Sequence, residues 1–522
     1  MKHRLKGLLA LVLSLVMVFA LATNAWAAVS IGGVEMGDGT TTTYYYNGTN
    51  GAQGSTSYTD TGNWNAKVER INGVQTLTLN NFSASGIYAY GDLTISLNGA
   101  NNIIENTSGD GIYFSDGTLT IIGTGTVNIS GTAEGISATS GGANVVISGG
   151  TVTASGTNNG ILASNITISG GTVEATGRDS GINANNITIS GGTVTAGSAT
   201  DNGSGDVTYN SSFGIKADSS ISITGGTVTA TGLDAIAIYE HTTTGTISIS
   251  GATTTVTANG GNSGIYAEGS VTISSGKVTA TAAEDDSCGI YGGNTITIGG
   301  DESKKLEVNV GCKTGLAANT VNIAKGSTVT IDSTEDAISN SATLNLGTGS
   351  RWYKWTDDKN ATTMNDSDFA LSAYNGNPPA YLKFEPLTYT VKFNANGGSG
   401  TMADATGVSG DYTLPANGFN APVGDEFFGW SVDPAGAERK RPGETMQITR
   451  DTTVYAIWKY ATLGNQGGGY PGTPQPPSIY IPTVEDEPEV TTPNTFDGGI
   501  ASAVVVTILS ATGGAWLAKK KD

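Results

Sequence analysis

Charged residues and histidine are scarce in this chain of 522 residues, and each scarcity excludes a class of site. Only 13% of the residues are charged, and Asp and Glu outnumber Lys and Arg by 45 to 25. Such an acidic surface repels nucleic acid and anionic lipid headgroups. The two histidines, His3 and His241, are too few for a His-based zinc centre. We therefore expect neither nucleic-acid binding nor a zinc site of that kind.

Cysteine is almost absent, which limits its chemistry to one pair. Cys288 and Cys312 stand about one repeat apart in the pattern described below. In a secreted protein this spacing suits a disulfide between neighbouring coils, and two stacked buried thiols are the alternative. Nothing around either residue indicates a reactive cysteine or a metal site.

What the sequence does contain is an internal repeat. The phrase Ile-Thr-Ile-Ser-Gly-Gly-Thr-Val stands at Ile166–Val173 and again at Ile187–Val194. Between the copies lies a second phrase, Gly-Ile, as in Gly181-Ile182 and Gly264-Ile265. Repeats of this length are typical of solenoids, in which each unit buries its apolar face against its neighbours.

The residues of the repeat predict strands. Ile, Val and Thr alternate with period two, and there is little Leu and no helical periodicity. Paired glycines such as Gly170-Gly171 and Gly191-Gly192 suit corners that need a positive φ. We therefore predict an all-β, right-handed parallel β-helix over residues 71–350, with roughly eleven coils stacked about 4.8 Å apart.

The segments before and after the repeats read as a leader and two caps. Residues 1–27 resemble a secretory signal peptide, with Leu8–Leu21 as the apolar region and Ala25-Trp26-Ala27 as the cleavage pattern. An uncleaved membrane anchor is the alternative. Residues 28–70 and 351–388 are expected to cover the two ends of the solenoid, because open strand edges need protection.

Residues 389–459 lose the repeat and gain aromatic and basic residues. The segment resembles the Listeria–Bacteroides repeat, the B-repeat of internalin-type surface proteins. The resemblance implies a small β-grasp domain with a display, spacer or adhesin role and no catalysis. The matching residues are Val391-Lys392-Phe393, Gly397-Gly398, Leu414-Pro415, Phe428-Gly429-Trp430, Pro442-Gly443 and Tyr455-Ala456-Ile457-Trp458.

The C-terminal part of the sequence reads as a stalk and an anchor. Residues 460–499 are rich in Gly and Pro and then acidic, as in an extended linker. Residues 500–522 contain the uncharged run Ile500–Ala518 followed by lysines, which predicts a transmembrane helix. Pro493 and Thr495 match a degenerate cell-wall sorting signal. Covalent attachment to the cell wall and simple membrane anchoring are both open.

The solenoid itself resembles secreted clostridial β-helix domains that are similar in fold to pectate lyases. The likeness rests on the strand Gln75–Asn81 and on the Gly-Ile-Tyr and Ile-Thr-Ile-Ser-Gly-Gly phrases. It implies binding of plant cell-wall polysaccharide or acidic glycans, with calcium in some members.

Four tyrosines follow Gly-Ile phrases and are predicted to point outward on one face: Tyr88, Tyr113, Tyr266 and Tyr291. Flat aromatic rings suit the apolar side of a sugar ring, so these residues are the predicted sugar-binding platform. The alternative is an aromatic ladder that only stabilises the solenoid surface.

Two other chemistries have weaker support in the sequence. Asp285 and Asp286 supply hard oxygen ligands for calcium but not at an EF-hand spacing, and solvated turns are the simpler explanation. A lyase needs a base, and Arg178 is the sole arginine within the repeats, with Asp179 and Glu174 nearby in sequence. We predict no catalytic residues.

The sequence thus predicts a non-catalytic, extracellular cell-surface protein that binds polysaccharide through its solenoid. An adhesin or stalk that binds a surface protein through the B-repeat is the second hypothesis. A polysaccharide lyase is the third.

Overall fold

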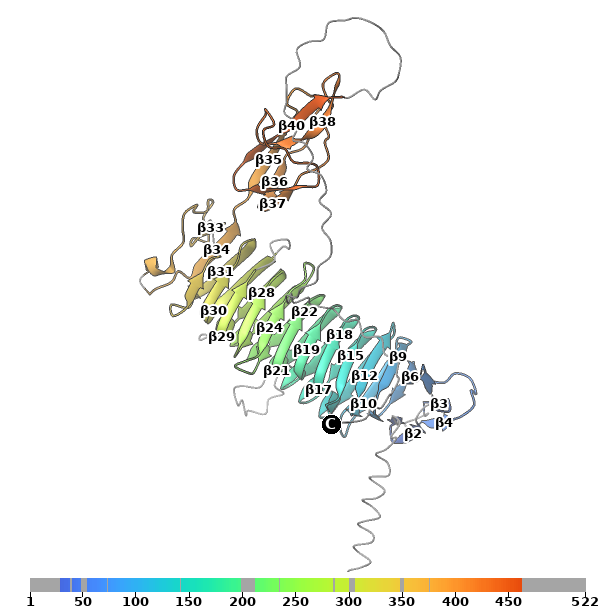
Figure 1. Ribbon diagram of the computed structural model, residues 1–522. Helices are drawn as coiled ribbons and strands as arrows, with labels where there is room; N and C mark the ends of the chain where they lie inside the picture. Colours follow the sequence, from blue (N-terminus) through green and yellow to red (C-terminus); the bar gives the residue numbers. More distant parts are fainter. Residues whose placement is uncertain are drawn as a thin grey trace, which may run out of the picture. The chain divides into compact units, whose positions relative to one another are not determined.

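A computed structural model describes most of the chain (Figure 1). The described ranges are 29–37, 40–47, 54–72, 74–140, 142–198, 212–233, 235–284, 287–299, 306–347, 352–374 and 376–461. The predicted signal peptide, the calcium ligands Asp285 and Asp286, the sorting motif at Pro493 and Thr495, and the C-terminal anchor lie outside these residues. Within these ranges, no helix has the length and apolar character needed to cross a bilayer.

The repeats form a parallel β-solenoid, as the sequence predicts. Each coil contributes to three long parallel sheets, and equivalent positions of successive coils pair in register. Ile166, for example, pairs with Val145 before it and Ile187 after it. The stacked coils are plain in Figure 1, running from the blue to the yellow part of the chain.

The first sheet contains the Ile-Thr-Ile-Ser strands. In order of pairing its strands are β6 (Val74–Asn80), β9 (Leu93–Asn98), β12 (Thr118–Gly123), β15 (Asn144–Ile147), β17 (Asn159–Ile168), β19 (Ser180–Ile189), β21 (Phe213–Ile223), β24 (Thr246–Ile249), β27 (Ser270–Ile273), β29 (Cys288–Ile298), β30 (Leu306–Ile323) and β32 (Thr343–Asn345).

The second sheet, called the threonine sheet, follows the glycine corner of each coil. Its strands are β7 (Ser83–Ala84), β10 (Asn102–Asn106), β13 (Thr126–Gly131), β16 (Thr151–Ser155), β18 (Thr172–Gly177), β20 (Thr193–Ser198), β22 (Thr227–Gly232), β25 (Thr255–Gly260), β28 (Gly276–Ala282), the first part of β30, and β31 (Ser327–Ile338).

The third sheet, called the tyrosine sheet, contains the Gly-Ile phrases. Its strands are β8 (Ile87–Tyr90), β11 (Ile112–Ser115), β14 (Glu134–Ser140), the first parts of β17, β19 and β21, β23 (Ile236–Glu240), β26 (Ser263–Ala267), the first part of β29, the middle of β30 and the end of β31.

The interior is a continuous apolar core built by alternation. In β18, Val173 and Ala175 are fully buried whereas Thr172 and Glu174 are exposed. The same pattern in successive coils stacks Val173 on Val152 and Val194, so each apolar side chain is covered by its neighbours along the solenoid. The glycine corners also follow the prediction, because the second glycine of the pairs at Gly171 and Gly192 has φ of 80° and 83°.

Antiparallel strands cover both ends of the solenoid. At the N-terminal end, β5 (Ala66–Ile71) pairs with β6, and β1 (Val29–Ile31) pairs with β8. The remaining N-terminal strands are β2 (Val34–Gly37), β3 (Thr43–Tyr46) and β4 (Ser55–Ser57). At the other end, β34 (Tyr381–Pro386) pairs with β31 and with β33 (Tyr353–Thr356), beside the 3-10 helix η1 (Leu371–Tyr374).

The last described segment is a small β domain with its own apolar cluster around Trp430. Its main sheet has the order β36 (Ala405–Val408), β35 (Tyr389–Asn394), β40 (Thr452–Tyr460) and β38 (Asp425–Ser431), in which β35 and β40 are parallel. A separate ribbon pairs β37 (Gly410–Thr413) with β39 (Thr445–Ile448).

Candidate functional site

The outward positions that follow the Gly-Ile phrases form one column along the tyrosine sheet. Tyr88 pairs with Tyr113 near its start, and Tyr266 pairs with Tyr291 near its end. The positions between the two tyrosine pairs are Ser137, Leu162, Asn183, Lys216 and Tyr239. The column is therefore aromatic at two separate places, Tyr88–Tyr113 and Tyr239–Tyr266–Tyr291, with Ser137, Leu162, Asn183 and Lys216 between them.

Ring geometry limits what the predicted platform can offer. The rings of Tyr266 and Tyr291 stack with centroids 4.4 Å apart and planes inclined by 16°, so each covers one face of the other. Tyr88 and Tyr113 are less tightly arranged, at 6.3 Å and 40°. The stacked pair leaves its edges, hydroxyls and outer faces for a ligand, and the sugar-binding platform at the four tyrosines stays a prediction.

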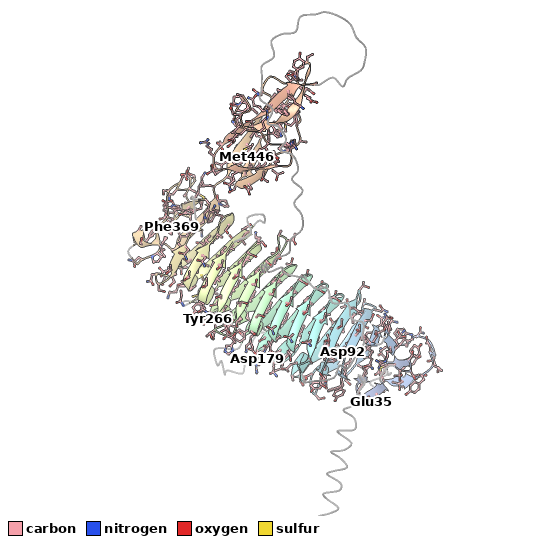
Figure 2. All side chains as sticks on the ribbon, in the orientation of Figure 1. Glu35, Asp92, Asp179, Tyr266, Phe369 and Met446 are labelled. Carbon is pink, nitrogen blue, oxygen red and sulfur yellow. The ribbon has the colours of Figure 1, made fainter. Side chains whose placement is uncertain are left out.

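A hollow of about 670 Å³ lies over the later part of the column. Asp179 and Tyr266, which border it, are labelled along the same edge of the solenoid in Figure 2. The lining residues are Asn159, Asp179, Ser180, Asn183, Phe213, Lys216, Ala235, Ile236, Tyr239, His241, Asn262, Tyr266 and Glu284. Aromatic rings, amides and charges of both signs therefore share one concave surface.

Tyr239 is the central aromatic residue of this hollow, and the sequence analysis missed it. Its ring stacks on Phe213 with centroids 4.8 Å apart and meets the Tyr266 ring edge-on at 5.6 Å. The coil that carries it reads Ala237-Ile238-Tyr239, with Ala in place of the glycine that defined the Gly-Ile phrase. Searching for any small residue before Ile-Tyr would have found it.

The two hydroxyls of the hollow stay protonated well above neutral pH. Burial is the main cause that raises the pKa of Tyr239 above its usual range, and the Glu268 carboxylate adds to the effect. Burial likewise raises the pKa of Tyr266 to about 12. Both phenols therefore serve as hydrogen-bond donors, and Tyr239 Oη already donates to Glu268 Oε1 at 3.5 Å.

Charged side chains of both signs border the hollow. Lys216 Nζ lies 5.6 Å from the centroid of the Phe213 ring and 4.0 Å from Asp218 Oδ1. Asp179 Oδ1 accepts a hydrogen bond from Arg178 Nε at 3.1 Å. The hollow thus has no strong excess of either charge, which suits a ligand bound mainly by hydroxyl contacts.

A series of hydrogen-bonded polar side chains connects the buried Glu134 carboxylate with Asn183 in the lining of the hollow. Asn159 Nδ2 donates to Glu134 Oε1 at 3.2 Å, and Asn183 Nδ2 donates to Asn159 Oδ1 at 3.5 Å. Ser180 is 1% exposed, and within the described ranges its Oγ has no hydrogen-bond partner. A buried hydroxyl without a partner is costly, so Ser180 lowers the stability of the wall beside the hollow.

The residues considered for lyase chemistry do not converge. Asp179 lines the hollow, whereas the Arg178 side chain is 60% exposed and is absent from the lining. Glu174 lies on the threonine sheet between Thr153 and Thr195, on a different face of the solenoid. The structure therefore does not place these three side chains in one site.

The two cysteines are free thiols on neighbouring strands. Cys312 Sγ donates to the Thr314 carbonyl at 2.8 Å, and Thr314 pairs with Cys288 in register. Burial raises the pKa of both thiols, that of Cys312 to about 12. Of the two sequence alternatives, the structure has the adjacent thiols and not the disulfide.

No cluster of three or more His, Cys, Asp or Glu side chains suited to a metal ion occurs among the described residues. Glu284, beside the predicted calcium ligands in sequence, lines the hollow. The calcium assignment of Asp285 and Asp286 stays a prediction, because both lie outside the described ranges.

Comparison with known proteins gives one match. A family model described as carbohydrate-binding domain-containing protein matches residues 61–237, a span that includes the coils from β6 to the start of β23. Neither a curated protein nor a solved structure matches the chain. The matched span contains one side of the hollow, including Asn159, Asn183 and Lys216.

Proposed function

We propose that this protein is a non-catalytic polysaccharide-binding protein and that the hollow over Tyr239 and Tyr266 is its principal binding site. The observation that carries the proposal is the combination of aromatic rings and amide side chains on one concave surface. Sugars are recognised in this way, because their C–H faces pack on rings while their hydroxyls exchange hydrogen bonds. The carbohydrate-binding family match over residues 61–237 supports the same ligand class.

The chemistry of the lining residues indicates which of them would contact the sugar ring and which would bind its hydroxyls. The outer parts of the Tyr239 and Tyr266 rings supply apolar contact. The Tyr239 hydroxyl, whose proton is donated to Glu268, accepts hydrogen bonds from sugar hydroxyls through its oxygen. The amides of Asn183 and Asn262 supply both donors and acceptors, which match sugar hydroxyls.

The test is retention of the purified protein on a panel of insoluble and acidic polysaccharides, with calcium and with chelator. A double variant, Tyr239→Ala with Tyr266→Ala, should weaken binding to the retained polysaccharide by about tenfold or more, the equivalent of about 1.4 kcal/mol. Tyr58→Ala is the matched control, since Tyr58 is 74% exposed and lies outside the hollow. No retention on any polysaccharide would refute the proposal.

Tyr88 and Tyr113 are proposed as a second, weaker platform on the same column. Tyr88 is 36% exposed, and its hydroxyl accepts a hydrogen bond from Asn106 Nδ2 at 2.9 Å, which fixes the ring. Replacing both tyrosines with Ala should weaken retention less than the change at Tyr239 and Tyr266. An equal or larger loss would move the principal site to this platform.

We also propose that the protein is located at the outer surface of the cell. The signal peptide and the membrane anchor that the sequence predicts at residues 1–27 and 500–522 favour an extracellular location at the cell surface. Under this view the small domain, with its resemblance to the B-repeat, acts as a spacer beside the solenoid. Fractionation of the native host's cells, followed by detection of the protein in wall, membrane and medium, tests this location.

A further inference from the structure

Basic residues gather on the small domain although the chain carries a net charge of −20. The basic cluster consists of Arg439, Lys440, Arg441, Arg450 and Lys459, all of them exposed. Arg439, Lys440 and Arg441 are consecutive in a chain with only 25 basic residues. Residues 389–460 carry six basic and eight acidic residues in all, so the local grouping of these cations, and not the net charge of the domain, points to an anionic partner at this place.

The backbone holds the basic cluster in a fixed position. Trp430 and Lys440 exchange two backbone hydrogen bonds, each of 2.8 Å, and the Trp430 side chain is fully buried in the domain core. The Arg441 amide donates to Glu444 Oε2 at 2.6 Å. The consecutive cations therefore extend from an ordered strand-like segment, which lowers the entropy lost on binding.

Neighbouring groups leave the cations available. The Arg439 guanidinium lies 4.0 Å from the centroid of the Phe428 ring, and Lys459 Nζ lies 5.1 Å from it. Lys459 pairs with Glu426 at 2.9 Å. In the part of the chain that the structure describes, Arg439, Lys440 and Arg450 form no ion pair within 4.0 Å.

A hollow of about 430 Å³ brings two of these cations together with hydroxyl groups. Lys440 and Arg450 line it, together with Ser431 and several threonines that offer hydroxyl donors. Met446, labelled in Figure 2, also lines it. Two carboxylates, Glu438 and Asp451, lie on the same lining, and Asp451 Oδ1 accepts a hydrogen bond from the Thr390 amide at 2.8 Å.

We propose that the basic cluster is a binding site for a polymer of repeating phosphate groups. The guanidinium group binds phosphate through two parallel hydrogen bonds, and lysine and hydroxyl donors complete such sites. A single small anion gains little at exposed cations in water, whereas a polymer contacts several of them at once and gains from their proximity. This site is separate from the polysaccharide hollow and does not depend on the proposed function.

The test uses the full chain and long-chain inorganic polyphosphate immobilised on a resin, at increasing salt concentration. We expect retention at low salt and steep loss as salt rises, because binding releases counterions. Lys440→Gln with Arg450→Gln should lower the affinity by about tenfold. Lys325→Gln with Lys354→Gln is the control, since it changes the net charge equally on another part of the chain. Glu438→Gln should strengthen retention.

Three results would overturn the proposal. The first is no retention of the wild-type protein at low salt. The second is an equal loss in the control variant, because net charge alone would then explain retention. The third is equally tight binding of polygalacturonate through Lys440 and Arg450, which would assign the site to carboxylate polymers. Circular dichroism and melting temperature of each variant establish that it is folded.

Discussion

At the scale of single residues, Glu240 departs most from its surroundings. Its column in the solenoid interior has Ala217 before it and Ala267 after it, yet Glu240 is fully buried there. Its Oε1 accepts hydrogen bonds from the amide and the hydroxyl of Thr242, at 2.6 and 2.7 Å. A Cβ at Gly245 would lie 1.8 Å from this oxygen, so the turn and the carboxylate are mutually adapted.

We expect Glu240→Ala to lower the free energy of unfolding by about 1–3 kcal/mol, because the Thr242 donors lose their acceptor. The small side chain itself fits, as the neighbouring alanines show. The urea midpoint of the solenoid transition measures the effect. Glu105→Ala, at an exposed carboxylate, should leave the midpoint nearly unchanged. A midpoint for Glu240→Ala equal to that of the wild type would contradict the structural role.

Glu134 should make stability depend on pH. Burial raises its pKa, and this effect outweighs the hydrogen bonds from Asn159 and Asn158 that lower it. The folded protein therefore holds this proton more tightly than the unfolded chain, so stability falls as pH rises through the folded pKa. Glu134→Gln removes the titration and should raise the melting temperature at neutral pH, with the gain shrinking as pH falls through the raised folded pKa toward the usual carboxyl range and constant below it.

Melting curves over a pH series measure this difference, and Glu174→Gln, at an exposed carboxylate of the threonine sheet, is the control. If the difference in melting temperature between Glu134→Gln and the wild type stays constant from neutral to acidic pH, the buried charge of Glu134 is not the cause of that difference.

At the scale of elements, the corner between the first sheet and the threonine sheet decides whether coils can stack. Gly192 has a φ of 83°, and a Cβ there would lie 2.6 Å from the Gly171 carbonyl oxygen. Position 192 therefore requires glycine for two reasons: its φ is positive, and there is no room for a Cβ atom. For Gly197, on the strand that follows, a Cβ would have as its one neighbour within 4 Å among the described residues the Thr231 carbonyl oxygen, at 3.9 Å.

We therefore expect Gly192→Ala to lower the free energy of unfolding by about 1–3 kcal/mol. The positive φ strains an alanine backbone, and the added methyl group lies too close to the Gly171 carbonyl oxygen. Gly197→Ala should be nearly neutral. Melting temperatures of the two variants compare the same chemical change at two places, and equal values would refute the corner argument.

The elements also show where sequence reasoning succeeds and where it fails. Strands with the repeated phrases were predictable, because Ile166 and Ile187 keep the same alternation and the same glycine corner. The coil of Tyr239 was missed because Ala237 replaces glycine. Its neighbours Phe213 and Lys216 were missed because they lie before and after a Gly-Ile phrase that lacks tyrosine. The hollow depends on which side chains align across coils of unequal length, and one sequence does not specify that alignment.

At the scale of the whole molecule, two apolar cores are separate. The solenoid core extends from Val29 to Phe384, and the core of the small domain begins at Val391. The sequence places a domain boundary at Tyr389, where repeat residues give way to aromatic and basic ones, and that boundary lies between the two apolar clusters. The ring stacking of Tyr266 on Tyr291 was beyond such reasoning, since it depends on side-chain rotamers.

Separate cores predict separable activities. A chain that ends at Pro386 should keep polysaccharide retention and the melting temperature of the solenoid, because its core is intact, and should lose retention on polyphosphate. The two resins used above measure both outcomes. Loss of polysaccharide retention in the shortened chain, with its melting temperature unchanged, would place the sugar site on the small domain.

The antiparallel strands at the two ends have a consequence for solubility. In-register parallel strands with identical side chains stacked above one another are also the arrangement of amyloid fibrils, which grow by adding chains at an open edge. Here β5 covers the N-terminal edge of the first sheet, β1 that of the tyrosine sheet and β34 the C-terminal edge of the threonine sheet, each in the antiparallel direction, so an incoming coil finds no matching parallel template at these edges. A sequence this repetitive can thus end at a defined length and remain a discrete particle instead of a seed for fibre growth.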